Sequence, residues 1–172
     1  MNTSKPRLQR IHIIGGPGSG KSYVARQLSQ HCGFPAYDLD ELFWDRAALR
    51  YGVRAETGER DARLVALTQG EQWIIEGVYY GWLRPSFERA DRIFVLRVNV
   101  FLRDWRIVKR FVSRKFGIRP TKKENLLDLY ELLQWNHQFD TGHLQQALKF
   151  MQEFEDKIVE CHHTNALFNQ VI

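Results

Sequence analysis

The sequence predicts an α/β fold in which a parallel five-stranded sheet carries helices on both faces. Two features of the chain lead to this fold class. Short apolar runs rich in β-branched residues alternate with longer amphipathic segments, which is the pattern of repeated strand–helix units. The first apolar run also leads directly into a glycine-rich loop and a helix. At 172 residues we expect one domain, residues 1–172, with room for a substantial core.

The glycine-rich loop is the most specific motif of the chain. Residues 15–22 match the phosphate-loop pattern G-x-x-x-x-G-K-[ST] between a predicted strand at 10–14 and a predicted helix at 22–32, with Gly33 after its end. Glycines permit positive φ and close backbone approach, so that successive N–H groups can surround a phosphate at a helix N-terminus. A plain turn is the alternative, but a plain turn would need neither the lysine nor the serine. The expected ligands of a nucleoside triphosphate are Gly15, Gly16, Pro17, Gly18, Ser19, Gly20, Lys21 and Ser22, with Lys21 on the β and γ phosphates and Ser22 on Mg²⁺.

Carboxylates stand at the ends of the next two predicted strands. Residues 36–39 form the second strand, which brings Asp38 and Asp40 to its carboxyl end. Because functional groups gather at this edge of open α/β sheets, both are catalytic candidates, and Asp38 is also a candidate metal ligand. The alternative is that one or both cap the following helix. The third strand, residues 73–77, ends at Glu76, which is either a ligand of Mg²⁺ through water or a simple turn residue.

Two aromatic residues and a charged segment follow the second strand. Phe43 and Trp44 either stack on a base or belong to the core. Residues 45–58 are charged and irregular in pattern, and they either cover a substrate or form an ordinary surface helix and loop.

The middle of the chain continues the alternation of helices and strands. Residues 59–69 predict a helix, and residues 78–89 a loop and short helix in which Arg84 and Arg89 are candidate phosphate contacts. Residues 91–98 predict another buried strand.

A basic helix is expected at residues 100–116, capped by Asn99. Its arginines recur at spacings of three and four and therefore share one face, beside a neighbouring apolar stripe. Like charges so close repel by a few tenths of a kcal/mol per pair, so we expect an anion to compensate them, although a solvated charged face is the alternative. The arginines are Arg103, Arg106, Arg110 and Arg114, and the stripe is Leu102, Trp105, Val108, Val112 and Phe116. We expect at least one of these arginines to clamp a phosphate.

The last third of the chain predicts two helices and a strand. A capping box, Thr121-x-x-Glu124, opens a helix whose expected core face is Leu126, Leu127, Tyr130 and Leu133. A turn at 140–142 precedes a helix at 143–155 and the last strand at 157–161. Residues 162–165 then form a turn that could lie against an adenine ring. His162 and His163 are adjacent and point in different directions, so a metal pair is not expected.

Composition narrows the class of protein. A net charge of +5 and a pI near 9.4 favour anionic partners such as nucleotides, phosphorylated metabolites or nucleic acid. No apolar run approaches the length of a membrane span, and residues 1–9 read as a polar, frayed tail without a signal peptide. The two cysteines, Cys32 and Cys161, have no metal-binding spacing and are expected as reduced thiols, which indicates a cytoplasmic protein without a membrane partner.

These motifs together resemble the small P-loop kinases of the adenylate kinase and shikimate kinase type, and most closely the bacterial DNA topology modulation (adenylate-kinase-related) proteins. The resemblance rests on segments 13–22, 38–44, 73–77 and 90–94 and on the basic helix, over about two thirds of the chain. It implies a P-loop NTPase fold with a short helical lid. It also implies that Asp38 lies beside Mg²⁺ and that Asp40 holds a substrate hydroxyl. Arginines of a lid at about 100–120 would clamp the transferring phosphate, with Arg103 and Arg106 as nucleotide ligands and Arg106 and Arg110 as catalytic residues. The chain departs from the group at Glu76, Ser86, Arg97 and Asn99.

The function expected from this reading is an ATP- and Mg²⁺-dependent phosphotransferase. Its partners would be ATP and a phosphoryl acceptor, either a hydroxyl-bearing small molecule or a nucleoside monophosphate. The alternative is a non-enzymatic, ATP-gated nucleic-acid-binding protein that modulates DNA topology. We favour it less because no DNA-reading motif accompanies the basic helix.

Overall fold

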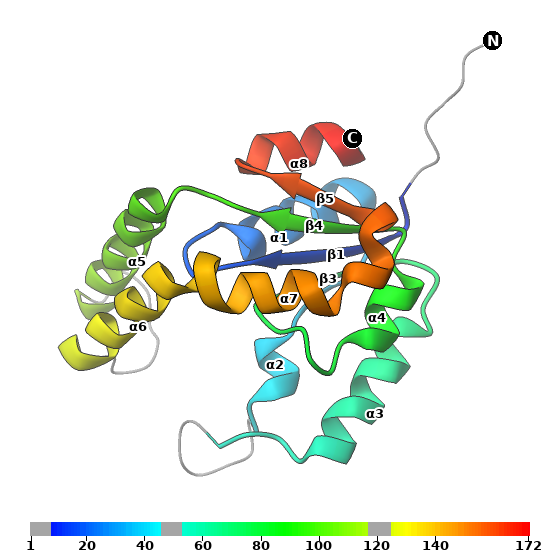
Figure 1. Ribbon diagram of the computed structural model, residues 1–172, viewed down its shortest axis with the longest axis horizontal. Helices are drawn as coiled ribbons and strands as arrows, with labels where there is room; N and C mark the ends of the chain where they lie inside the picture. Colours follow the sequence, from blue (N-terminus) through cyan, green and yellow to red (C-terminus); the bar gives the residue numbers. More distant parts are fainter. Residues whose placement is uncertain (1–7, 46–52, 117–124) are drawn as a thin grey trace.

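A parallel sheet forms the centre of the computed structural model, which describes residues 8–45, 53–116 and 125–172. Five strands are hydrogen-bonded in the order β2-β3-β1-β4-β5, and every described pair is parallel (Figure 1). The predicted fold class is therefore confirmed. The strands are β1 (Arg10–Gly15), β2 (Ala36–Asp38), β3 (Trp73–Gly77), β4 (Arg92–Leu96) and β5 (Ile158–Cys161).

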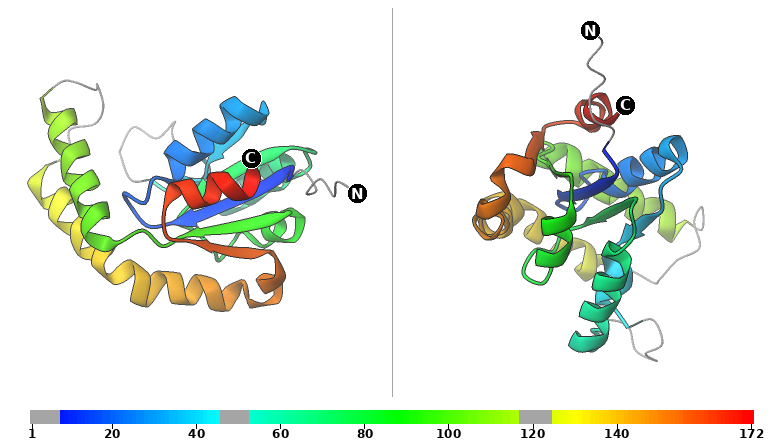
Figure 2. Two further views of the ribbon diagram at one scale, coloured as in Figure 1. Left: turned by 90° about the horizontal axis from the view of Figure 1, so that it is seen from above. Right: turned by 90° about the vertical axis from the view of Figure 1, so that its right-hand side faces the viewer.

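Helices cover both faces of the sheet, with one core on each side (Figure 2). Side chains of β1 alternate between the faces: Ile11 and Ile13 join one core, and Ile14 joins the other. The first core lies under α1 (Lys21–Cys32) and α8 (Thr164–Val171), and the second under α4 (Arg84–Arg89) and α7 (Leu144–Phe150). The short α2 (Asp40–Phe43) and α3 (Thr57–Thr68) follow β2 in the chain.

Local signals set the helix ends in the first half of the chain. Gly33 ends α1 in the left-handed conformation, with φ of 77°, and its N–H bonds the Ser29 carbonyl. Glu56 caps α3 by accepting a hydrogen bond from the Glu59 N–H. Asn99 accepts a hydrogen bond from the Phe101 N–H at 2.9 Å, so the predicted cap of the basic helix is confirmed.

The basic helix α5 (Val100–Lys115) and α6 (Leu126–Gln138) form an antiparallel hairpin beside the sheet (Figure 1). The capping box predicted at Thr121 and Glu124 lies outside the described residues. The structure instead begins α6 at Leu126, where Asn125 and Asp128 form a reciprocal capping box.

The turn predicted at 140–142 is wrong. Residues Phe139–His143 form a π-helical turn, η1, that joins α6 to α7 almost without interruption. Phe139 is fully buried and its ring lies 5.4 Å from that of His143, so tertiary packing keeps this polar stretch helical. The helix predicted at 143–155 ends earlier, because α7 stops at Phe150 and the 3₁₀ helix η2 (Gln152–Lys157) leads to β5.

The predicted core face of α6 is also wrong, and most of the apolar stripe predicted on α5 is exposed. Trp105, Val112 and Phe116 are exposed, whereas Arg103, Ile107 and Phe111 form the buried side of α5. On α6, the predicted core residues Leu126, Leu127 and Tyr130 are exposed. On α5 the buried side is formed by Arg103, Ile107 and Phe111 instead of the stripe, which lies on another side of the helix.

Candidate functional site

The glycine-rich loop lies between β1 and α1, at the edge of the sheet formed by the carboxyl ends of the strands, here called the carboxyl edge. Gly18 and Gly20 have φ of 69° and 94°, values that side chains other than glycine rarely adopt. A Cβ on Gly18 would lie 2.5 Å from the Arg103 carbonyl oxygen. The sequence therefore needs glycine here both for the turn and for the close approach of α5.

A cavity of about 330 Å³ opens beside this loop. The predicted residues Pro17, Gly18, Gly20, Lys21 and Ser22 line it together with Arg106 and Arg110 of α5. Tyr23 and Arg26 of α1 also line the cavity, and the sequence reading missed both. Their signal was the helical spacing, since Arg26 lies one turn after Ser22 on the same face of α1.

Arg106 binds the loop directly. Its Nη1 donates to the carbonyl oxygens of Gly18 and Ser19, at 3.2 and 3.1 Å. The Arg106 guanidinium is thus held at the rim of the cavity. Arg106 and Gly18 lie 88 residues apart in the sequence.

Arg103 lies deeper than the other predicted lid residues. It is fully buried, and a Cβ on Gly16 would lie 2.2 Å from its Nη1, so its guanidinium packs against the loop. Its Nη2 pairs with an Asp140 carboxylate oxygen at 2.5 Å and donates to the Asn136 carbonyl at 3.4 Å. The anion that compensates this arginine is a carboxylate of the chain, and Arg103 ties α5 to the α6–α7 helices.

Two carboxylates, Asp38 and Glu76, lie near Lys21 at the carboxyl edge. Asp38 and Glu76 are paired in register on β2 and β3, and the Lys21 Nζ lies 4.0 Å from Glu76 Oε2. Burial raises the pKa of Glu76 to about 7, against the opposing pull of Lys21, and it also raises the pKa of Asp38. A nearby divalent cation would favour the charged form of both groups.

Asp40 is held by a residue that the sequence reading missed. The Tyr79 hydroxyl donates to Asp40 Oδ1 at 2.7 Å, and the Tyr79 ring stacks on Phe43 with centroids 4.4 Å apart. Burial and the Asp40 carboxylate raise the pKa of Tyr79, which keeps its hydroxyl protonated as a donor. Asp38 accepts a hydrogen bond at 2.9 Å from the N–H of Asp40, the first residue of α2. Asp38 therefore also stabilises the start of this helix, in line with the alternative that it caps the helix.

Buried polar atoms without a partner gather at this edge. Among the described residues, Ser19 Oγ, Glu76 Oε2 and the Nε and Nη1 of Arg103 are buried and lack a hydrogen bond. Such atoms are costly in a folded protein unless a ligand or water satisfies them. The cradle of glycines suits phosphate oxygens, and Glu76 with Ser22 suits a hydrated Mg²⁺, so the residues fit a magnesium–nucleotide complex.

Other predicted contacts lie elsewhere. Arg84 pairs with Glu88 and Glu153, and Arg97 with Glu160. Ser86 is buried and lies 3.1 Å from Nδ1 of His12, whose pKa burial lowers to about 3. None of these residues lines the cavity beside the loop.

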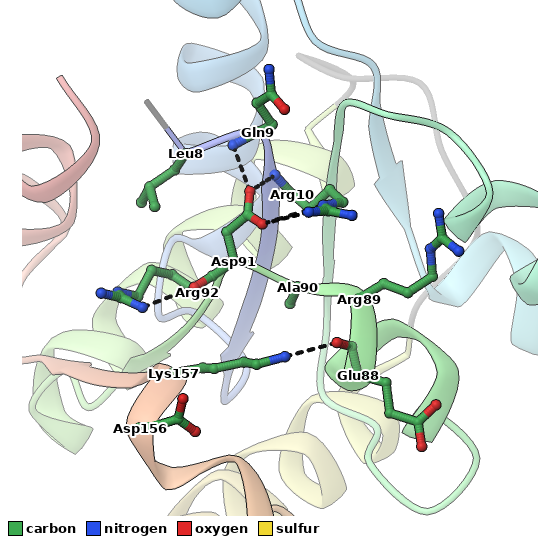
Figure 3. Close-up of a pocket in the computed structure, with 10 residues that line it drawn as sticks. All are labelled: Leu8, Gln9, Arg10, Glu88, Arg89, Ala90, Asp91, Arg92, Asp156 and Lys157. Carbon is green, nitrogen blue, oxygen red and sulfur yellow. Dashed lines mark hydrogen bonds and ion pairs between the residues drawn. The ribbon is translucent and has the colours of Figure 1, made fainter. Parts of the chain in front are cut away.

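A second cavity, of about 630 Å³, lies at the opposite, amino edge of the sheet (Figure 3). Asp91 there accepts hydrogen bonds from the N–H groups of Gln9 and Arg10 and from the Arg10 guanidinium. The Lys157 Nζ donates to the carbonyls of Phe87 and Glu88. Arg89, a predicted phosphate contact, lines this cavity and not the one beside the glycine-rich loop. Asp91 and Lys157 thus bind backbone groups of neighbouring segments, so these charged side chains serve mainly to stabilise the fold.

Two further findings bear on partners. No group of three or more His, Cys, Asp or Glu side chains comes together as a metal site within the described ranges. Among the helices that the structure describes, none is long and apolar enough to cross a membrane.

Comparisons with known proteins place the fold. No protein-family model and no curated protein matches the sequence. Among solved structures, a gluconokinase from Sinorhizobium meliloti 1021 has a TM-score of 0.51 at 16% identity and covers 97% of this chain and 89% of its own. A shikimate kinase from Bacteroides thetaiotaomicron has the same TM-score and identity over 92% and 88%. An uncharacterized protein from Eubacterium ventriosum has a TM-score of 0.53 at 13% identity over 95% and 96%. The chain therefore has the fold of P-loop kinases.

Proposed function

We propose that the protein is a P-loop phosphotransferase that moves the γ-phosphoryl group of ATP, with Mg²⁺, to a small-molecule or nucleoside monophosphate acceptor. One observation carries the proposal. The loop, the lysine, two strand-end carboxylates and a lid arginine converge on one edge of the sheet, with buried polar atoms left to satisfy. The finer likeness to the DNA topology modulation group rests on sequence motifs alone.

The donor half of the site follows from charge and position. Bound Mg²⁺·ATP supplies the transferable phosphoryl group and the divalent charge that phosphoryl transfer requires. Lys21 and the backbone N–H groups of residues 15–22 other than Pro17 would bind the phosphates, and Ser22, Glu76 and Asp38 would hold the metal and its water. Arg106 needs only to rotate from the Gly18 and Ser19 carbonyls to donate to a phosphate oxygen. Arg110 lines the same cavity one helical turn further along.

The acceptor half is built around Asp40. Its carboxylate, held on one oxygen by Tyr79, is placed to accept the proton of an attacking hydroxyl. Phe43 stacks on Tyr79 and has the Arg54 guanidinium 5.4 Å from its ring, while Arg60 lies 4.5 Å from the Trp82 ring. Aromatic faces beside cations suit an acceptor that carries both an apolar or planar part and a negative charge.

An ADP-release assay across candidate acceptors tests this function. The panel contains nucleoside monophosphates, polyols, and gluconate and shikimate, after which two structural neighbours are named. We expect one class to raise ADP release above the rate with water alone, and Asp40→Asn to remove that increment while ATP binding persists. An increment that survives in Asp40→Asn would contradict the acceptor assignment, and no ATP binding by the wild type would contradict the donor site.

The nucleic-acid alternative has less support in the geometry. Two of the four arginines on which it rested, Arg103 and Arg106, bind the Asp140 carboxylate and the loop carbonyls within the chain. Duplex binding that weakens steeply with salt would revive it.

A further inference from the structure

A single helical turn contacts both halves of the proposed site. The turn η1 (Phe139–His143) joins α6 to α7 and is the junction between these two helices in Figure 1. It is π-helical, so its backbone hydrogen bonds span five residues where those of an α-helix span four. Such turns are rare inside α-helices and occur frequently at functional sites. The contacts of its side chains therefore bear on how the site is built.

Phe139 and Asp140 connect the turn to the glycine-rich loop. A Cβ on Gly16 would lie 2.9 Å from Phe139 Cδ1 and 2.2 Å from Arg103 Nη1, so both side chains pack closely against the loop. Both are fully buried. Arg103 also pairs with Asp140 at 2.5 Å and lies 5.7 Å from the centre of the Phe139 ring. The turn thus holds, directly and through Arg103, the side chains against which the loop packs.

His143 connects the same turn to the acceptor half of the site. Its Nε2 lies 2.5 Å from the Val78 carbonyl oxygen, and because a carbonyl oxygen only accepts hydrogen bonds, this nitrogen carries a proton and donates. The imidazole ring contacts the rings of Tyr80, Trp135 and Phe139, with centroids between 5.0 and 5.9 Å apart. The turn therefore anchors the backbone of the segment that follows β3.

The anchored segment carries the residue that holds Asp40. Tyr79 follows Val78 in the chain, and its hydroxyl donates to Asp40 Oδ1 at 2.7 Å. The Tyr80 hydroxyl donates to Gln146 of α7, also at 2.7 Å, so a second bond fastens the segment to the helix that follows the turn. A shift of the Val78 backbone would reach the Tyr79 hydroxyl, and through it the Asp40 carboxylate, across a single residue.

Stability alone does not account for these contacts. Nε and Nη1 of Arg103 and Oδ1 of Asp140 are buried and form no hydrogen bond among the described residues. A buried polar network with unsatisfied members is less favourable for folding than an apolar core of the same size. The arrangement favours a role in fixing the positions of groups over a role in stability only.

We propose that η1 is a positioning element that sets the Asp40 carboxylate relative to the glycine-rich loop. On the loop side it acts through Asp140 and Arg103. On the acceptor side it acts through His143 and Tyr79. Phosphoryl transfer depends mainly on the placement of donor and acceptor, so an element that fixes their separation raises the rate without touching the substrate. This catalytic consequence rests on the proposed function, whereas the mechanical link between the two sides does not.

A double-mutant cycle in urea unfolding tests the mechanical link without any ligand. Asp140→Asn and Tyr79→Phe change the two ends of the link. Independent sites change the folding equilibrium constant by factors that multiply, and we expect the double variant to differ from that product by at least about threefold. The matched control combines Tyr79→Phe with Asp156→Asn, an exposed acid at the amino edge, and its factors should multiply. Multiplying factors in the Asp140 cycle would overturn the proposal. If Asp140→Asn does not fold, Asp140→Glu replaces it, since it keeps the charge and shifts it by one methylene.

His143 variants test the catalytic consequence with the acceptor that the ADP-release assay identifies. His143→Phe keeps an aromatic ring and removes the hydrogen bond to Val78. We expect its kcat to fall about tenfold with the ATP dissociation constant and the acceptor KM unchanged, because a misplaced Asp40 affects the transition state. His143→Gln, which can donate again, should recover most of the loss. A similar loss in both variants, or weaker ATP binding with unchanged kcat, would make His143 a structural residue and overturn the proposal.

The two measurements separate this inference from the proposed function. If no acceptor raises ADP release, the proposed function fails, and the cycle still decides between a mechanical link and independent contacts. If the factors of the Asp140 cycle multiply while acceptor-dependent ADP release is observed, the inference fails and the proposed function stands.

Discussion

The two edges of the sheet differ in what their charged groups do. The amino edge has the larger cavity, about 630 Å³ against about 330 Å³ at the loop. Its ionic groups are mostly engaged, with Asp91 accepting from two backbone N–H groups and a guanidinium, and Lys157 donating to two carbonyls. The cavity at the carboxyl edge is smaller, yet Ser19, Glu76 and Arg103 bury four side-chain atoms that form no hydrogen bond among the described residues, against one such atom, Arg89 Nε, in the lining of the amino-edge cavity.

This difference shows that the chemistry of the lining identifies a site better than its volume does. Charges that satisfy each other stabilise the fold and leave nothing for a ligand to bind. Buried polar atoms without partners destabilise the empty protein, so their concentration around a glycine loop indicates a ligand that satisfies them. The substitutions below test whether the two edges divide function and stability in this way.

The largest effect is expected from replacing Lys21 at the carboxyl edge, and its counterpart is the replacement of Lys157 at the amino edge. Lys21→Ala should lower ATP turnover by about 100- to 1000-fold, because a charge on the transferring phosphates is lost. Lys157→Ala should leave turnover within about twofold and reduce the free energy of unfolding by about 1 kcal/mol through two lost hydrogen bonds. Steady-state ADP release and urea unfolding measure the two quantities. Full turnover in Lys21→Ala would break the comparison.

Two glycine substitutions distinguish the cost of a left-handed backbone from the cost of a steric clash. Gly18→Ala should cost about 2–4 kcal/mol of folding free energy, since it combines a left-handed backbone with a clash against the Arg103 carbonyl. Gly33→Ala has a similar positive φ and open space around it, so only the backbone cost of about 1–2 kcal/mol remains. Equal losses for the two variants in urea unfolding would show that the approach of α5 does not restrict the loop.

Asp91→Ala tests the structural role of the amino edge. It leaves the Gln9 and Arg10 N–H groups without their acceptor and should cost about 1–2 kcal/mol, with ATP turnover unchanged. Burial opposes ionisation, but the backbone N–H groups and Arg10 outweigh it and lower the pKa of Asp91. Its contribution is therefore present above the unfolded pKa of about 4 and is lost as the pH falls further. Acid titration of wild type and variant should converge there. A loss of turnover would assign this edge to the active site instead.

Glu76 should give the smallest effect and one of opposite sign. Burial raises its folded pKa to about 7 from the usual value of 4.5, so the stability that protonated Glu76 contributes falls as the pH rises from 4.5 to about 7 and is fully lost above it. In metal- and nucleotide-free buffer, Glu76→Gln should therefore raise Tm by about 1–3 °C at pH 8 and change it little at pH 5. A lower Tm at pH 8 would mean that the Lys21 contact outweighs burial.

The sequence predicted the parts of this molecule that rest on local pattern. Strand β1, the loop and α1 were placed to within a residue or two because glycine positions and a β-branched run specify them locally. Asp38, Glu76 and Lys21 were expected together because parallel strands end at one edge, and the register pairs the two acids. Asn99 was read correctly as a cap for the same local reason.

The errors arose where distant contacts decide the outcome. Arg103 is buried and Trp105 exposed because Asp140, 37 residues further along, neutralises the arginine, and no local pattern reports such a pair. The Tyr79–Asp40 bond joins residues 39 apart. The turn predicted at 140–142 stays helical because Phe139 is buried. Helix α8 was not predicted, because its 8 residues are too few to show a clear apolar repeat. Its Leu167 is nevertheless fully buried.

Amide hydrogen exchange with and without Mg²⁺·ATP tests the division between the two edges most directly. At a nucleotide concentration about 100 times the dissociation constant, bound segments should gain up to about 2.7 kcal/mol of protection. We predict that protection falls on the loop and first turns of α1, residues 15–26, and on α5 around Arg106, while residues 88–92 and 156–157 at the amino edge are unchanged. Protection confined to the amino edge, or none at either edge, would contradict the assignment of the carboxyl edge as the nucleotide site.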